Sequence, residues 1–186
     1  MIARTDAPRT VLPALTGARI LAVPAVMALI LAGPKNQSAY TAAAIVFAVA
    51  AITDFADGYL ARRWAVTTKL GSFLDTTADK LLVTGALIAL VDVDRASPWL
   101  AAIIIGRELL ILGLRGVVAA DGVVFPPSIW GKLKTNVQFV AIFLAIVRWG
   151  GQIGPFYLDE WVMIAAAAIT VLSAVEYITR FSSALR

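Results

Sequence analysis

Four aspartates stand within 26 residues of a chain that is otherwise largely apolar around them: Asp54, Asp57, Asp75 and Asp79. The first two are spaced i, i+3 and the last two i, i+4, so on helices each pair would lie on one face. Two such faces brought together would form a metal site with oxygen ligands only. Carboxylates so close together repel one another, and bound cations are the simplest way to neutralise them. The spacing therefore predicts a site for Mg²⁺ or Mn²⁺.

Four carboxylates suit two metal ions rather than one. Two ions about 4 Å apart could hold a diphosphate oxygen and stabilise a leaving group. Gly58 and Gly71 remove side chains beside the acids, which would let a substrate approach the backbone. Arg62 adds a fixed positive charge for a phosphate.

The composition places these acids in a membrane protein. Of the 186 residues 60% are hydrophobic, and the mean hydropathy is +0.85, which is too apolar for a soluble domain. Cysteine and histidine are absent, which excludes disulfides, zinc sites built on sulfur or nitrogen, and catalysis by either residue. The net charge of +4 is explained first by membrane topology and contact with anionic lipids, and we expect no nucleic-acid binding.

Six apolar segments approach the roughly 20 residues that a helix needs to span a bilayer. Their length predicts an all-α fold, a bundle of six transmembrane helices that forms one domain over residues 1–186. The expected spans are 10–33, 39–62, 71–91, 97–120, 130–149 and 157–181.

The lysines and arginines orient this bundle. With six spans, both termini share one side of the membrane with the 62–70 and 115–134 connections, and most basic residues lie on that side. The positive-inside rule makes this side cytoplasmic, so the acids lie at the cytoplasmic face of the cell membrane. A plainer interpretation is that such acids only anchor helix ends at the interface. In a divalent-cation transporter they would line a pathway, although their position at one edge of the membrane argues against it.

The same residues resemble a known family, the CDP-alcohol phosphotransferases. The pattern D-x2-D-G-x2-A-R-x8-G-x3-D-x3-D of that family is reproduced by Asp54, Asp57, Gly58, Ala61, Arg62, Gly71, Asp75 and Asp79. The resemblance implies a six-helix membrane enzyme, usually a homodimer. Such an enzyme transfers a phosphatidyl or similar group from a CDP-linked donor, such as CDP-diacylglycerol, to an alcohol and releases CMP.

The resemblance also implies a role for each residue of the pattern. Metal ions would be bound by Asp54, Asp57, Asp75 and Asp79, and the CDP part of the donor by Asp57, Gly58, Ala61, Arg62 and Gly71. Asp79 would also act as the general base, which agrees with the chemistry, because a hydroxyl that attacks phosphorus must lose its proton. Two divalent ions would stabilise the negative charge that gathers on the leaving CMP.

Charges deep in the fourth and fifth segments indicate how the acceptor alcohol is bound. The segments GRELLILGLR and WGKLKT contain Arg107, Glu108, Arg115, Lys132, Lys134 and Thr135. Four cations exceed what one glutamate neutralises, and a dianionic phosphate on the acceptor would account for the surplus. Alternatively, the glutamate and an arginine could merely lock two helices together.

These segments resemble those of family members that use glycerol 3-phosphate, which implies this acceptor. Inositol phosphate and phosphatidylglycerol remain alternatives within the same reaction class. The opening segment TVLPALTGARILAVP also resembles the first helix of the family, so the resemblance covers almost the whole chain. It departs at Ala14, where the family usually has asparagine.

Overall fold

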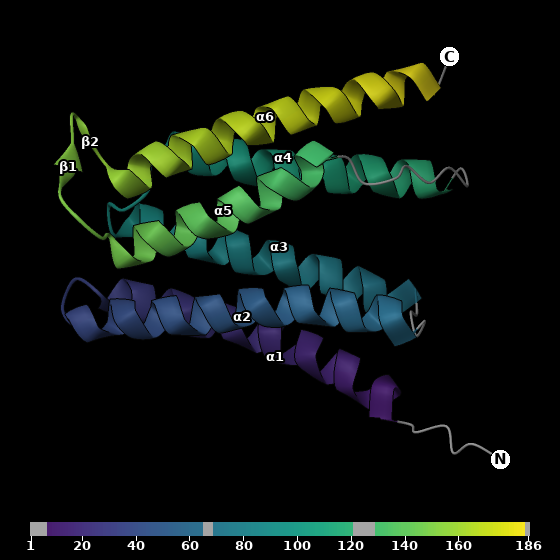
Figure 1. Cartoon of the computed structure of the whole chain (residues 1–186), viewed down its shortest axis with the longest axis horizontal. Coiled ribbons are helices and arrows are strands. Elements are labelled where there is room, and N and C mark those ends of the chain that lie inside the picture. The colour runs from purple at the N-terminus through teal and green to yellow at the C-terminus, as the bar shows by residue number, and fades with distance from the viewer. Residues whose placement is uncertain (1–6, 65–68, 121–128, 185–186) are drawn as a thin grey trace. The chain divides into compact units, whose positions relative to one another are not determined.

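The structure is a computed structural model that describes residues 7–64, 69–120 and 129–184. Within these ranges, side chains are described for residues 16–53, 71, 73–117, 130–131 and 133–180. Six helices account for most of the described chain (Figure 1), and the prediction of an all-α fold is confirmed. They are α1 (Ala7–Ala32), α2 (Gln37–Trp64), α3 (Lys69–Asp92), α4 (Pro98–Ala120), α5 (Ile129–Val147) and α6 (Leu158–Ala184).

The helix boundaries follow local sequence signals. Asn36 precedes α2, and its side-chain oxygen accepts a hydrogen bond from the backbone N–H of Ser38 at 3.2 Å, as an N-cap does. Helix α4 begins at Pro98, whose fixed φ suits the first helical position. At the start of α6, the Glu160 carboxylate accepts a hydrogen bond from the backbone N–H of Tyr157 at 2.9 Å. The helices therefore begin within a few residues of the expected spans.

One helix segment passes a length and hydropathy test for a membrane span within the described residues. This segment is Leu158–Arg180 in α6, with a mean hydropathy of 1.9. Shorter apolar segments occur at Thr16–Ala32, Gln37–Thr53 and Leu133–Val147. Helices α3 and α4 carry several charged residues within their length, among them Asp75 and Asp79 in α3 and Arg107 and Glu108 in α4.

The chain forms two compact units, residues 1–89 and 90–186. In the first unit, α1 packs against α2, and the buried side chains include Val26, Ile30 and Phe47. Helix α1 also approaches α3 closely at Gly85, where a Cβ would lie 2.8 Å from Val23 Cγ1. The absence of a side chain at Gly85 thus sets how near α1 comes to the helix that carries Asp75 and Asp79.

In the second unit, α6 packs against both α4 and α5 (Figure 1). A short hairpin of β1 (Gln152–Ile153) and β2 (Phe156–Tyr157) connects α5 to α6. Arg148 lies just before it, 3.3 Å from the buried Asp159 carboxylate and 4.7 Å from the centre of the Tyr157 ring. This cation joins the end of α5 to the start of α6.

The close approach at Gly85 gives a test of the packing between α1 and α3. We expect Gly85→Ala to lower the free energy of unfolding by about 1–3 kcal/mol, because Val23 has a stiff branched side chain that must shift. Thermal unfolding of the detergent-solubilised protein measures the change. Gly17→Ala on α1 is the control, since a Cβ there meets no atom within 4 Å. Equal unfolding midpoints for the two variants would contradict the packing.

Candidate active site

The two pairs of aspartates lie on helices, as their spacing requires. Asp54 and Asp57 belong to α2, and Asp75 and Asp79 belong to α3. Side chains of the α2 residues in the pattern lie outside the described residues, and so does the side chain of Lys132. Among the described side chains, no group of three acids could hold a metal ion. The structure therefore describes the α3 half of the predicted metal site.

Asp75 has a direct partner on α1. Arg19 Nη1 donates a hydrogen bond to Asp75 Oδ1 at 2.8 Å, and the Arg19 side chain is 1% exposed whereas that of Asp75 is 39% exposed. The buried guanidinium offsets the charge of a carboxylate that remains open to solvent or substrate. This role of Arg19 was not predicted from the sequence, although an arginine in the middle of an apolar helix is a signal for a buried partner.

The donors on α3 fit a hard divalent cation. Asp75 and Asp79 are one turn apart and offer only carboxylate oxygens, which are the ligands that Mg²⁺ and Mn²⁺ prefer. Gly71, also on α3, precedes Asp75 by one turn and adds no side chain there. The two carboxylates on α3 therefore fit the predicted metal site.

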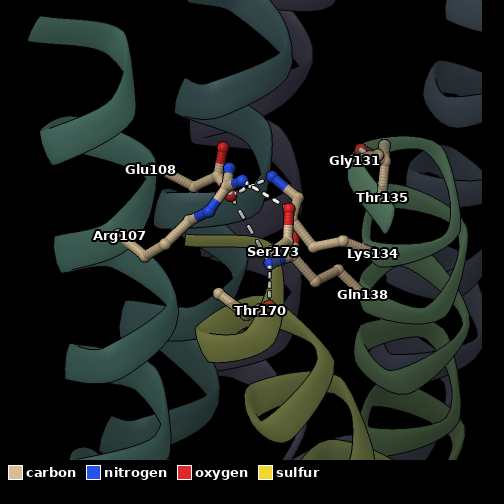
Figure 2. A network of polar contacts seen from close by, with 8 residues as sticks. All are labelled: Arg107, Glu108, Gly131, Lys134, Thr135, Gln138, Thr170 and Ser173. Carbon is tan, nitrogen blue, oxygen red and sulfur yellow. Dashed lines mark hydrogen bonds and ion pairs between the residues drawn. The ribbon is translucent and has the colours of Figure 1, made fainter. Parts of the chain in front are cut away.

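A buried polar cluster occupies the second unit (Figure 2). At its centre is Glu108 on α4, which is 3% exposed. Its Oε1 atom forms a salt bridge with Lys134 of α5 and lies 3.5 Å from Arg107 Nη1. Lys134 is itself 5% exposed. One carboxylate therefore serves two cations, and this group carries a net positive charge in an apolar setting.

Helix α6 supplies further contacts to this cluster (Figure 2). Arg107 Nη2 donates to Ser173 Oγ at 2.8 Å. Gln138 Nε2 donates to Thr170 Oγ1 at 2.8 Å and lies 3.5 Å from Glu108 Oε1. Gln138, Thr170 and Ser173 were not predicted from the sequence. They could have been found as isolated polar residues in apolar helices, because hydrogen-bonding groups in such helices need partners.

The structure joins two of the predicted acceptor residues through a shared carboxylate and gives two others different contacts. Arg107 and Lys134 meet at Glu108 (Figure 2). Arg115 is exposed, and its guanidinium carbon lies 5.6 Å from the centre of the Tyr177 ring. The Thr135 hydroxyl donates to the Gly131 carbonyl of its own helix at 3.2 Å. The cluster is therefore formed by Arg107 and Lys134 around a shared counter-ion.

Comparison with known proteins gives the family. A family model described as CDP-alcohol phosphatidyltransferase matches residues 10–172. Relatives named CDP-diacylglycerol–glycerol-3-phosphate 3-phosphatidyltransferase include a protein of Bacillus subtilis (strain 168), which is 37% identical over 92% of this chain and 95% of its own length. Proteins of the same name from Rickettsia typhi and Shigella flexneri serotype 5b are 37% and 41% identical, over 88% and 74% of this chain and 92% and 77% of their own lengths. With its aspartate pattern and a match over most of its length, this chain belongs to the CDP-alcohol phosphatidyltransferase family.

Proposed function

We propose that this protein transfers the phosphatidyl group of CDP-diacylglycerol to glycerol 3-phosphate, forming phosphatidylglycerophosphate and releasing CMP. Family membership supports the reaction class, and the names of the relatives support the acceptor. The observation that carries the choice of acceptor is the buried cluster around Glu108, whose two cations, Arg107 and Lys134, exceed its single negative charge. A phosphate dianion is the ligand that such a surplus suits.

The aspartate pattern would serve the donor. Asp54, Asp57, Asp75 and Asp79 would hold two Mg²⁺ or Mn²⁺ ions, a number that four carboxylates suit, and the bound metal would supply positive charge to the diphosphate and the leaving CMP. Contacts to the CDP part would come from Gly58, Ala61, Arg62 and Gly71, with Asp57.

In the transfer step, the acceptor oxygen forms a bond to the phosphatidyl phosphorus, and the bond from that phosphorus to the CMP oxygen breaks. The hydroxyl proton goes to Asp79, which stands one helical turn after Asp75 on α3. Arg107 and Lys134 would hold the phosphate that the acceptor already carries, with the arginine offering a planar pair of donors and the lysine a point charge.

The membrane arrangement proposed with this function has six spanning helices, with both termini and the active site on the cytoplasmic side, in a homodimer. The clustering of lysine and arginine on one side of the predicted topology supports the orientation, and the homodimer rests on the family resemblance alone. A lipid donor could then enter from the bilayer while a soluble acceptor arrives from the cytoplasm.

CMP release tests the function directly. We expect the purified protein to release CMP from CDP-diacylglycerol when glycerol 3-phosphate and Mg²⁺ or Mn²⁺ are present, and chelation of the metal to stop the release. Release with inositol phosphate or phosphatidylglycerol alone would contradict the acceptor, and no release with any alcohol would contradict the function.

Asp79→Asn is the matched variant for this assay, since it keeps the side-chain shape but removes the basic carboxylate. We expect it to lower turnover by at least about 100-fold, which is the usual contribution of a general base. CDP binding, measured by calorimetry, should change little. Near-normal turnover in this variant would exclude Asp79 as the base.

A double variant tests whether the Glu108–Lys134 pair helps to bind the acceptor or only joins α4 to α5. Lys134→Met alone leaves a buried carboxylate with one fewer partner, which can cost about 3–5 kcal/mol of stability, whereas Lys134→Met with Glu108→Gln removes both charges and should fold more stably. We expect the double variant to bind glycerol 3-phosphate about tenfold or more weakly, because a hydrogen bond to a charged group is lost. Calorimetry measures this affinity. An unchanged affinity would mean that the cluster only joins α4 to α5.

Labelling of introduced cysteines tests the topology, and the chain has no native cysteine to interfere. We expect a membrane-impermeant maleimide to label Ser97→Cys, in the α3–α4 connection, in intact cells. Ser183→Cys, near the C-terminus, should react only after lysis, because the positive-inside rule places it in the cytoplasm. The reverse labelling pattern would overturn the orientation.

A further inference from the structure

Three side chains of α6 form a polar stripe along one side of the helix. Thr170, Ser173 and Tyr177 are spaced i, i+3 and i+7, which places them on one face. Thr170 is 0% exposed and Ser173 is 2% exposed. Each of the three contacts a polar residue of α4 or α5, namely Gln138, Arg107 and Arg115 respectively. The stripe therefore faces the segments in which sequence analysis placed the acceptor site.

Ser173 fixes one end of the Arg107 guanidinium. Nη2 of Arg107 donates to the Ser173 hydroxyl at 2.8 Å, while Nη1 points toward Glu108 Oε1 at 3.5 Å (Figure 2). The two terminal nitrogens are thus directed by two different helices. Because the guanidinium is planar, two such contacts restrict the orientation of the whole group.

The chemistry of the Ser173 contact leaves the charge of Arg107 available. A hydroxyl accepts the hydrogen bond without bringing a negative charge, unlike the carboxylate of Glu108, which Arg107 shares with Lys134. The arginine is therefore held in place by a neutral partner and can still attract an anion. A bidentate contact to a phosphate needs this kind of fixed orientation, since small misplacements weaken it.

Thr170 has a similar positioning role for Glu108, the counter-ion of Arg107 and Lys134, which it reaches through Gln138. Its hydroxyl accepts a hydrogen bond from Gln138 Nε2 at 2.8 Å, and the same amide nitrogen lies 3.5 Å from Glu108 Oε1. Thr170 thus orients the Gln138 amide, which in turn contacts the carboxylate at the centre of the cluster. At the end of the stripe, the Tyr177 ring lies under the Arg115 guanidinium at 5.6 Å, within the range of a cation–π contact.

We propose that the α6 stripe of Thr170, Ser173 and Tyr177 packs behind the basic residues of the acceptor site, and that Ser173 is a positioning residue which orients Arg107 toward the phosphate of the acceptor. The proposal rests on the proposed function for the identity of that acceptor. It adds α6 to the segments of α4 and α5 that would bind the acceptor. Ser173 acts through Arg107 and takes no part in the bond-making step.

The test compares Ser173→Ala with Ser173→Thr, which keeps a hydroxyl. Glycerol 3-phosphate dependence of CMP release is measured for each variant, together with calorimetric binding of glycerol 3-phosphate. We expect Ser173→Ala to raise the KM for glycerol 3-phosphate and to weaken its binding about tenfold, the effect of losing a hydrogen bond to a charged group. The kcat and the KM for CDP-diacylglycerol should stay within about threefold, and Ser173→Thr should restore the KM, because the positioning contact is regained.

Thr179→Ala is the control on the same helix, since Thr179 is exposed and its hydroxyl donates to the Glu176 carbonyl at 2.8 Å. It should behave like the unsubstituted protein. A Ser173→Ala protein with an unchanged KM for the acceptor would overturn the proposal. So would an equal loss with both substrates that Ser173→Thr does not restore, because a purely structural role predicts that pattern. If Ser173→Ala does not fold, Ser173→Cys, with a weakly accepting sulfur, makes the same comparison.

The same assays distinguish failure of the proposed function from failure of the Ser173 proposal. If the unsubstituted protein releases CMP only with another phosphorylated alcohol, the acceptor assignment fails, and a raised KM of Ser173→Ala for that alcohol still supports the positioning role. If the unsubstituted protein neither turns over nor binds any phosphorylated alcohol, the positioning role is overturned together with the function.

Discussion

The shared carboxylate of Glu108 is the interaction on which the second unit depends. A charge buried among apolar helices is costly unless it is paired, and Glu108 is paired with Lys134 and approached by Arg107. These partners come from α4 and α5, so the ion pair bridges two helices that both pack against α6. Because one carboxylate serves two cations, the same interaction that joins the helices leaves positive charge for an anion.

The first unit uses a buried cation in a related way. Arg19 is almost fully buried, while the carboxylate of Asp75 that it contacts is 39% exposed. The arginine thus holds one oxygen of an acid whose other side remains accessible. Close packing of α1 on α3 at Gly85 keeps the two helices near enough for this contact. In the predicted metal site, one carboxylate is thus already held by a cation on a neighbouring helix.

Helix α6 makes two kinds of polar contact, one through neutral hydroxyls and one through a charged carboxylate. The hydroxyls of Thr170 and Ser173 carry no charge. Thr170 binds the Gln138 amide and Ser173 binds the Arg107 guanidinium, and both of these groups lie close to Glu108. A neutral partner can fix the orientation of a cationic side chain without neutralising its charge. At the other end of α6, the pairing of Arg148 with Asp159 uses full charges, because there the requirement is to join two helices.

Much of this protein follows from the sequence by itself. The lengths of the apolar segments predicted six helices, and the eight positions from Asp54 to Asp79 indicated the family, because their residue types and spacing form a specific pattern within one short stretch of chain. The sequence also marked Arg107, Glu108 and Lys134 as charges that need partners. Tertiary structure decided which partners they have. Ser173 and Thr170 lie 66 and 32 residues from the side chains they contact, and Arg19 lies 56 residues from Asp75. Contacts at such separations depend on which helix faces pack together, and that choice is made by the sum of many weak side-chain contacts rather than by any local pattern.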